Sequence, residues 1–575
     1  MKAVYLAQIS HRFGENAFLP YSVGRLWAAV PEDLRDHYRL AELLWQREPI
    51  PLVLERMAAD PPDVLGISLY IWNERYSLAL AAAVAERFPG VCVIAGGPQV
   101  PEQPSRRAMW LEASPSVSVA VIQEGERAFV ELLRQRLAGL PLVPPEGRIP
   151  DLLALGSPYL SGVFDELLAI KGVAWQAVQE THRGCPFKCH FCNWGSAVYS
   201  AVREFPIDMV TAEIAWCGEH GIDLLYNADA NFAMLKRDPE IAAALIETKR
   251  RHGAPSKFRA AWGKKTTSRL FQIGRDLADA GLCKGVTLSV QSMDSGVLRA
   301  VERRNTPYEE FARLVRDYRA AGVPTYTEVI LGLPAETYPS FTDGVSRIFE
   351  AGQHDGLNIY PLIMLENSEM AAPAYRERWG LRTVELPMLL LHGNAQQSDP
   401  HEERYQLVIE TSTLAHAGWR RAMLFGWVAQ GLHCLGLTQD AAIAAHADGR
   451  SYAQIYESAL AWALAHPDTV LGEAVSRAEA LLDDVLAGRD TWNRAVAHLG
   501  PITWPPEELL FLRCTQQIDR FYAEIATGLG LAPAPLARTR ETLRLPEDYG
   551  GDLESWAREV VWYGRKGGER RKEAA

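Results

Sequence analysis

The sequence predicts an α/β protein in which two αβ units are followed by a mostly helical region. Short apolar stretches of strand length alternate with amphipathic stretches up to about residue 375, and the strand signal then fades. A chain of 575 residues with 48% hydrophobic content is long enough to bury several cores. We therefore expect domains over 1–145, 173–375 and 376–575, with a linker over 146–172 that continues the proline-rich passage PLVPPEGRIP.

The first domain is expected to be Rossmann-like. Its buried parallel strands are predicted from four runs, AVYLAQIS, VLGISLY, VCVIAGGP and VSVAVIQEGE. Between them, LALAAAVAERFPG predicts an amphipathic crossover helix that ends at Pro89 and Gly90. In an open sheet of this kind, ligands bind at the loops that follow the carboxyl ends of the strands.

The second domain is expected to be a partial (β/α)6 barrel of the TIM type. Six strands separated by helical runs are predicted from VAWQAVQE, IDLLYNAD, KFRAAWGK, GVTLSVQS, PTYTEVILG and GLNIYPLIM. Barrels of this type carry their chemistry at the carboxyl ends of the strands. The region after it, 376–575, is expected to be mostly helical and to serve as a possible substrate cap over the barrel mouth.

Charge and composition limit the partners. The net charge of −12 comes without a long basic run, so we expect neither nucleic acid nor a membrane surface as a partner. The start of the chain lacks the pattern of a signal peptide, and no stretch approaches eighteen apolar residues, so a cytoplasmic protein is expected. In that reducing compartment disulfides are rare, and five scattered cysteines are expected to be small buried hydrophobes: Cys92, Cys217, Cys283, Cys434 and Cys514.

Three further cysteines form a CxxxCxxC array directly after the first barrel strand, in THRGCPFKCHFCNWG: Cys185, Cys189 and Cys192. A structural zinc site needs four ligands, so the array is one ligand short unless His182 or His190 completes it. An iron–sulfur cluster fits better, because thiolates are its usual ligands. Three thiolates leave one iron of a four-iron cluster open to a small molecule.

The array resembles that of the radical S-adenosylmethionine (SAM) superfamily, in which an aromatic residue, here Phe191, precedes the last cysteine. The resemblance implies a 4Fe-4S cluster whose open iron binds the amino and carboxylate groups of SAM. One electron from the cluster then cleaves SAM to methionine and a 5′-deoxyadenosyl radical. An electron donor of the flavodoxin or ferredoxin type is implied as a partner.

The same resemblance implies SAM contacts at later strand ends. Asp229 and Asn231 in NADANF would meet the amino group, unless they are only a polar strand end; Lys264 or Lys265 would meet a carboxylate, unless they are surface lysines. Glu328 points either into the barrel or into a salt bridge. Phe191 is also an expected SAM contact. The ribose or carboxylate is expected to contact Ser289, Gln291 and Arg304, and the adenine is expected to contact Gly332 and Pro334.

Motifs of the first domain resemble the cobalamin-binding fold that precedes the barrel in one radical SAM class. The implied cobalamin-binding residues follow three strands: Ser68, Leu69, Tyr70 and Trp72; Gly96 and Gly97; and Gln123, Glu124, Gly125 and Glu126. The family elsewhere ligates cobalt through DxHxxG, whereas this chain has ISHRFG, with His11 present and Ile9 in place of the aspartate. Without that carboxylate a ligating histidine loses its orienting partner. We expect cobalt without a histidine below it, with the apolar LYIW loop on that face.

The combined resemblance implies a cobalamin-dependent radical SAM C-methyltransferase that moves a methyl group from SAM via methylcobalamin to a carbon of an unknown small-molecule or peptide substrate. Two alternatives keep both cofactors: ring contraction or oxidative cyclisation without methyl transfer, and non-radical methylation of an aromatic carbon, as in tryptophan. A third is a cobalamin or cluster sensor without turnover, which would have no need of an open iron beside a SAM cleft.

Overall fold

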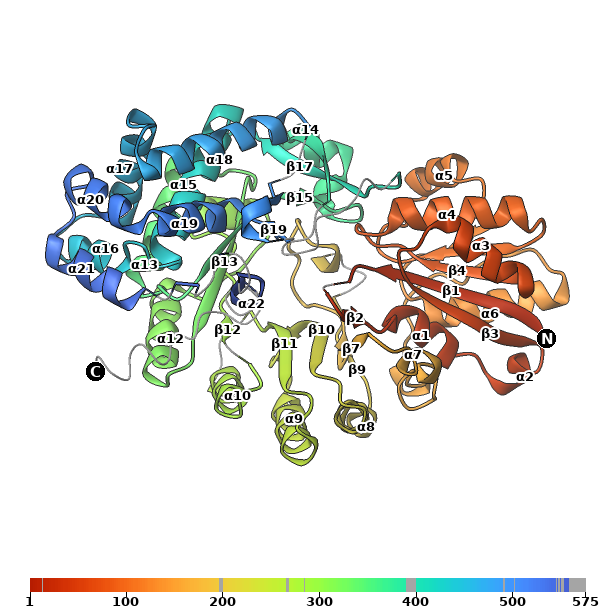
Figure 1. Cartoon of the computed structure of the whole chain (residues 1–575). Helices are drawn as coiled ribbons and strands as arrows, with labels where there is room; N and C mark the ends of the chain where they lie inside the picture. The colour runs from red at the N-terminus through yellow and green to blue at the C-terminus, as the bar shows by residue number, and fades with distance from the viewer. Residues whose placement is uncertain are drawn as a thin grey trace.

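The computed structural model places most of the chain. The residues that it describes are 1–12, 14–195, 200–264, 268–283, 285–388, 400–489, 492–500, 502–543, 545–546, 549 and 553–557. Figure 1 shows the first domain on one side of the barrel and the C-terminal helices on the other. The predicted α/β architecture with a helical C-terminal region is confirmed.

The first domain is an open parallel sheet in the order β3-β1-β4-β5-β6. The strands are β1 Lys2–Ser10, β3 Tyr38–Gln46, β4 Pro62–Ser68, β5 Cys92–Gly96 and β6 Val119–Ala120. One face packs against α1 Tyr21–Ala28 and α6 Gly125–Ala138, and the other against α3 Ile50–Ala59 and α4 Glu74–Arg87. The carboxyl ends of β1 and β4 face the barrel (Figure 1), and those of β5 and β6 lie at the same edge because the strands are parallel.

The barrel contains all six predicted strands, and the described residues form two parallel sheets. Its strands are β7 Ala174–Gln179, β10 Leu224–Phe232, β11 Lys257–Trp262, β12 Val286–Thr287, β13 Thr325–Leu331 and β14 Leu357–Pro361. Outside them lie α8 Ile207–Glu219, α9 Asp238–His252, α10 Ser268–Asp279, α12 Tyr308–Ala320 and α13 Tyr338–Glu350. A seventh strand, β2 Asn16–Phe18, pairs with β7, so a short piece of the first 145 residues belongs to the barrel sheet.

An antiparallel sheet joins the end of the predicted run GLNIYPLIM to two strands that the sequence did not predict. It consists of β15 Ile363–Met364, β16 Arg382–Pro387 and β17 Arg404–Glu410, with β17 in the centre. The helices that follow are α15 His416–Ala429, α16 Gln439–Ala447, α17 Tyr452–Ala465, α18 Val470–Leu486, α19 Pro506–Gln516, α20 Ile518–Gly528 and α21 Pro533–Thr542. Helices α15 and α17 pack against α13, so this bundle covers the outer wall of the barrel.

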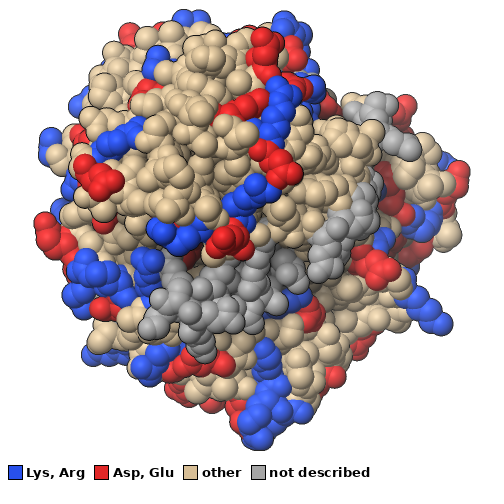
Figure 2. Space-filling view, turned by 60° about the vertical axis from the view of Figure 1, so that its left-hand side comes forward, with Lys and Arg blue, Asp and Glu red and all other residues tan. Residues whose placement is uncertain are grey.

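Two surface properties follow from the described residues. No described helix is long and apolar enough to cross a bilayer. On the face seen in Figure 2, the lysine and arginine side chains are interspersed with aspartate and glutamate.

Side chains from beyond the barrel hold the first domain in place. The buried carboxylate of Glu403 accepts hydrogen bonds from the backbone N–H groups of Arg75 (2.8 Å) and Tyr76 (2.9 Å) at the start of α4, and it pairs with Arg47. A carboxylate at a helix N-terminus is favoured by the helix dipole and by charge-assisted hydrogen bonds. Asn367 makes a second contact, donating to the carbonyl oxygens of Pro98 and Val100, both at 2.9 Å.

Replacing Glu403 with alanine is expected to weaken this attachment by about 2–3 kcal/mol, because three hydrogen bonds to one buried carboxylate are lost together. Hydrogen exchange at the first turn of α4, followed by mass spectrometry, should become faster. Glu402→Ala is the matched control, since its ion pair with Arg404 lies at the surface. Equal protection of α4 in both variants would contradict the assignment.

Candidate active site

A cavity of about 550 Å³ lies between the first domain and the barrel. Nine of the ten residues predicted for cobalamin line it, and Leu69 is buried behind Gly97. The loop of the cysteine array reaches the same cavity through Cys192, Asn193 and Trp194. The nine are Ser68, Tyr70, Trp72, Gly96, Gly97, Gln123, Glu124, Gly125 and Glu126.

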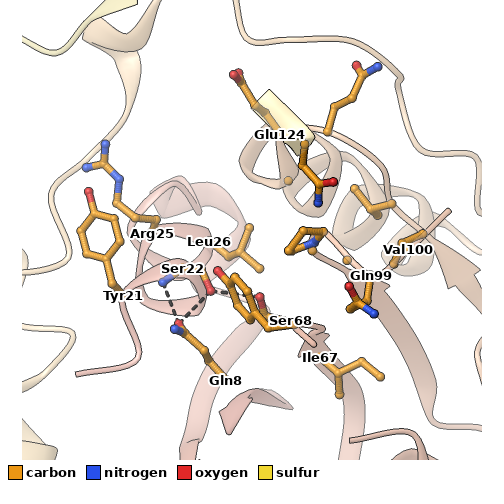
Figure 3. Close-up of a pocket in the computed structure, with 18 of the residues that line it drawn as sticks. Gln8, Tyr21, Ser22, Arg25, Leu26, Ile67, Ser68, Gln99, Val100 and Glu124 are labelled. Carbon is orange, nitrogen blue, oxygen red and sulfur yellow. Dashed lines mark hydrogen bonds between the residues drawn. The ribbon is translucent and has the colours of Figure 1, made fainter. Parts of the chain in front are cut away.

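A small polar network lies at one end of this cavity, where β1, β4 and α1 meet (Figure 3). Ser22 donates to the Gln8 amide oxygen from its backbone N–H (2.8 Å) and its hydroxyl (2.7 Å). The hydroxyls of Ser22 and Ser68 are 3.0 Å apart. Burial raises the pKa of Tyr70, and hydrogen bonds with these two serines partly oppose the shift. Most of the remaining lining is apolar, with Leu26, Ile67 and Val100 among the labelled side chains.

The loop after β4 places two aromatic rings at the cavity. Tyr70 and Trp72 are stacked, with ring centroids 4.4 Å apart. Asn73, which is fully buried, holds the loop by accepting from the Tyr70 N–H (2.7 Å) and donating to the carbonyl oxygens of Ile9 (2.9 Å) and Ser68 (3.1 Å). The sequence did not predict this role: an asparagine just before a helix suggests a cap, but the Asn73 side chain makes no capping hydrogen bond to α4.

The glycines after β5 allow the backbones of two loops to touch. Gly97 has φ +102°, and a Cβ there would lie 2.5 Å from the Leu69 carbonyl oxygen. The Leu69 N–H donates to the Gly96 carbonyl oxygen (2.7 Å). A side chain at position 97 would therefore push the Tyr70 loop out of place.

The segment from Gln123 to Glu126 joins the first domain to the barrel. Glu126 forms a buried ion pair with Arg183 (2.6 Å), and Glu124 pairs with Arg203. Burial would raise the pKa of Glu126, but the charge and hydrogen bonds of Arg183 outweigh it and hold the pKa below its usual value. Gln123 has a positive φ, and its buried amide oxygen has no hydrogen-bond partner among the described residues. This oxygen fits an amide-bearing ligand such as cobalamin.

The three cysteines of the array gather at the carboxyl end of β7. Cys185 and Cys189 are buried, while Cys192 borders the cavity. Burial raises the pKa of the Cys192 thiol, and the positive charge of Lys264 opposes the shift. The Lys264 ammonium lies 3.8 Å from the Cys185 sulfur and 4.0 Å from the Cys189 sulfur. This donor set is suited to an iron–sulfur cluster.

A zinc site would need His182 or His190 as its fourth ligand, but both side chains have other partners. His182 is paired with Asp229 at 3.1 Å, and His190 lies 3.2 Å from the Tyr375 hydroxyl. In the described part of the chain, no group of three or more His, Cys, Asp or Glu residues could hold a single metal ion.

Asp229 has a structural role, because its carboxylate accepts several hydrogen bonds from neighbouring segments. Its carboxylate accepts from the backbone N–H groups of Thr181 (2.7 Å) and His182 (3.1 Å), from the Thr181 hydroxyl and from the Asn227 amide (3.0 Å). Burial would raise the pKa of Asp229, but these bonds and His182 hold it below its usual value. Asp229 thus secures the segment that leads to Cys185, and its oxygens are occupied. Asn231, two residues later, faces Cys185 instead.

At the fourth strand end, the structure brings together only some of the residues expected for SAM. The Ser289 hydroxyl donates to Glu328 (2.5 Å), so Glu328 forms a hydrogen bond within the barrel. Gln291 has a positive φ, and its buried amide oxygen has no hydrogen-bond partner among the described residues. Arg304 is exposed, whereas its neighbour Arg303 is buried and donates to the Ser289 carbonyl oxygen (2.5 Å).

The turn after β13 is tightly built. Gly332 has φ +95°, and its N–H donates to Glu336 (2.7 Å); Pro334 is buried in the same turn. Burial raises the pKa of Glu336 to about 8, although two backbone N–H groups oppose the shift.

Two further residues were expected to contact SAM. Phe191 packs against a small apolar cluster beside the barrel, and Lys265 lies outside the described residues. The roles of these residues toward SAM stay predictions.

Comparisons with known proteins show the family of the chain. The profile described as the Radical SAM superfamily matches residues 180–344. The cobalamin-dependent radical SAM methyltransferase TokK of Streptomyces tokunonensis is 35% identical over 93% of this chain and 83% of its own length. A 2-(S-pantetheinyl)-carbapenam-3-carboxylate methyltransferase of Streptantibioticus cattleyicolor is 35% identical over 92% of this chain and 82% of its own length.

A solved structure is similar over nearly the whole chain. It is that of OxsB, a cobalamin-dependent SAM radical enzyme, with aqua-cobalamin and SAM bound. The TM-score is 0.55 at 13% identity, covering 97% of this chain and 84% of that one. At this level of identity the likeness concerns the fold.

Proposed function

The chain belongs to the cobalamin-dependent radical SAM methyltransferases, and we propose that it methylates a carbon of a small carboxylated substrate of the carbapenam class. The observation that carries the proposal is the shared cavity. Gly96, Gly97 and Gln123 of the first domain line the same space as Cys192 of the cluster loop. A cobalamin bound at the strand ends would therefore face the site of SAM cleavage.

The residues of the chain have distinct parts in this reaction. When bound, cobalamin supplies the methyl group, and the cluster supplies the electron that cleaves SAM. Cys185, Cys189 and Cys192 would hold the cluster, and the apolar cavity wall keeps water from the reacting groups. The buried pair of Arg183 and Glu126 fixes the first domain against the strand that leads into the array.

The substrate class is proposed from one relative and from the barrel interior. The relative from Streptantibioticus cattleyicolor is named for methylation of a pantetheinyl carbapenam carboxylate. Along β11, Arg259 is exposed while its neighbours Phe258 and Ala260 are buried, so Arg259 lies on the face of the strand opposite to theirs. Burial raises the pKa of Tyr326 and of Tyr360, and the charge of Arg259 opposes both shifts from across the barrel. A substrate carboxylate would be attracted by this guanidinium.

The proposal includes cobalt without a histidine ligand, because the described lining of the cavity includes no histidine. EPR of the bound cobalt(II) is then expected to show no axial nitrogen splitting.

The proposal also includes two statements about partners. The cluster needs a one-electron reductant, for which we propose a cytoplasmic flavodoxin or ferredoxin. The net charge of −12 and the interspersed charges on the face seen in Figure 2 support a small-molecule substrate over nucleic acid or a membrane surface.

The test uses anaerobic, cluster-reconstituted protein with cobalamin, a reductant, methyl-labelled SAM and a pantetheinyl carbapenam carboxylate. Mass spectrometry is expected to show the labelled methyl group in the product, with 5′-deoxyadenosine and S-adenosylhomocysteine formed together. Deoxyadenosine without a methylated product would favour ring contraction or cyclisation. A methylated product without deoxyadenosine would favour the non-radical alternative.

A further inference from the structure

Asn231 lies against one of the cluster ligands. It is fully buried near the carboxyl end of β10, and its side-chain nitrogen is 3.2 Å from the Cys185 sulfur. A cluster-bound thiolate can only accept a hydrogen bond, so the amide must present its N–H group to this sulfur. The orientation of the amide is thus determined by the chemistry of its partner.

That orientation directs the other end of the amide away from Cys185. The Asn231 oxygen is buried and has no hydrogen-bond partner among the described residues. The nearby carboxylate of Asp229 is occupied by Thr181, His182 and Asn227. Asn231 is therefore the residue of this strand end whose polar group is directed at the array.

Lys264 approaches the same sulfurs from the end of the neighbouring strand. Its ammonium lies within 4.0 Å of both Cys185 and Cys189. The ammonium also lies over the Phe187 ring, 4.9 Å from its centroid, which helps to hold it beside the array. Two adjacent strands, β10 and β11, thus deliver a hydrogen-bond donor and a positive charge to the same two thiolates.

We propose that Asn231 and Lys264 raise the reduction potential of the cluster bound by Cys185, Cys189 and Cys192. Reduction adds one negative charge, which is shared by the cluster sulfurs and the thiolates. Hydrogen bonds to the sulfurs and a nearby cation stabilise the more negative state more than the oxidised one. The electron donor can then reduce the cluster more completely before SAM is cleaved. This inference rests on the proposed function, because it requires a cluster on these cysteines.

The test is a redox titration of the reconstituted holoenzyme, in which the EPR signal of the reduced cluster is followed against the applied potential. Asn231→Leu removes the donor with little change in volume, and Lys264→Met removes the charge. Each variant is expected to lower the reduced-to-oxidised ratio at the wild-type midpoint about tenfold, which corresponds to about 59 mV for a one-electron couple. Lys264→Arg keeps the charge and should restore most of the ratio.

Gln353→Leu is the matched control. Gln353 is also a fully buried amide of the barrel, but it bonds to the Thr325 hydroxyl (2.7 Å) and the Gly356 carbonyl oxygen (3.2 Å) at the amino end of β13 and not to a cysteine. It should destabilise the protein without moving the midpoint. Unchanged midpoints in Asn231→Leu and Lys264→Met, at full iron and sulfide content, would overturn the inference. If the Asn231→Leu variant does not bind the cluster, the midpoint of the Lys264→Met variant decides whether the inference holds. Failure of the wild-type protein to bind iron and sulfide would instead contradict the proposed function.

Discussion

Replacing Cys189 with alanine is expected to abolish cleavage of SAM, with 5′-deoxyadenosine falling by more than about a thousandfold. The cluster depends on three thiolates, and two cannot hold it with one iron open. Without the cluster no electron reaches SAM, and a thousandfold loss corresponds to about 4 kcal/mol in the barrier. Iron and sulfide analysis, with quantification of deoxyadenosine in the same samples, measures the effect.

Cys217→Ala controls for the loss of a buried cysteine. Cys217 is fully buried on α8, and it lies in the hydrophobic core rather than in the array. Its replacement is expected to cost about 1–2 kcal/mol of stability through the cavity that it leaves. Deoxyadenosine should still form in this variant. Retention of iron and of deoxyadenosine formation by Cys189→Ala would contradict the assignment of the array.

Replacing Gly97 with alanine is expected to weaken cobalamin binding at least about a hundredfold, or about 3 kcal/mol. The added methyl group would collide with the Leu69 backbone and displace the loop that carries Tyr70 and Trp72. The positive φ at Gly97 adds about 1 kcal/mol of backbone strain for alanine. Equilibrium titration with cobalamin, followed by its visible absorbance, measures the change.

Gly90→Ala separates the backbone strain from the collision. Gly90 has φ +97°, close to that of Gly97, but a Cβ there would meet nothing within 4 Å. Its replacement should cost about the same strain and leave cobalamin binding within about twofold of the wild type. Equal losses of affinity in the two variants would show that the close approach to Leu69 is not what shapes the site.

Sequence patterns predicted the strands whose signal is local. The six barrel strands and the four ligand-bearing strands of the first domain are runs of β-branched and apolar residues bounded by turn residues. Strand β3, YRLAELLWQ, was missed because its alternation of charged and apolar residues also suits a helix. Strands β16, RTVELP, and β17, RYQLVIE, were missed because charged and polar residues interrupt their apolar runs, whereas β15 lies at the end of the predicted run GLNIYPLIM.

The candidate site shows the same difference between features that local sequence patterns predict and features that depend on the tertiary structure. Glycine motifs and cysteine spacing are local, so Gly96, Gly97 and the array could be placed before the fold was known. The partner of a polar side chain depends on which segments meet in space. The sequence placed Asp229 and Asn231 at one strand end, and folding directs the first to Thr181 and the second to Cys185; their contacts with SAM stay a prediction. Both Arg303 and Arg304 follow the helix Ser295–Ala300, where the chain directs Arg303 to the Ser289 carbonyl oxygen and leaves Arg304 exposed.

By itself, the sequence determined the domain order, the cofactor chemistry and the family-level function, because each depends on residue types at short, regular spacings. The tertiary structure decided which polar groups meet. It showed that the cavity of the first domain reaches Cys192, that Glu403 and Asn367 attach this domain from outside the barrel, and that Asn231 faces a cluster ligand. These contacts join residues far apart in the chain, and only packing of the whole molecule selects them from the many pairs that the sequence allows.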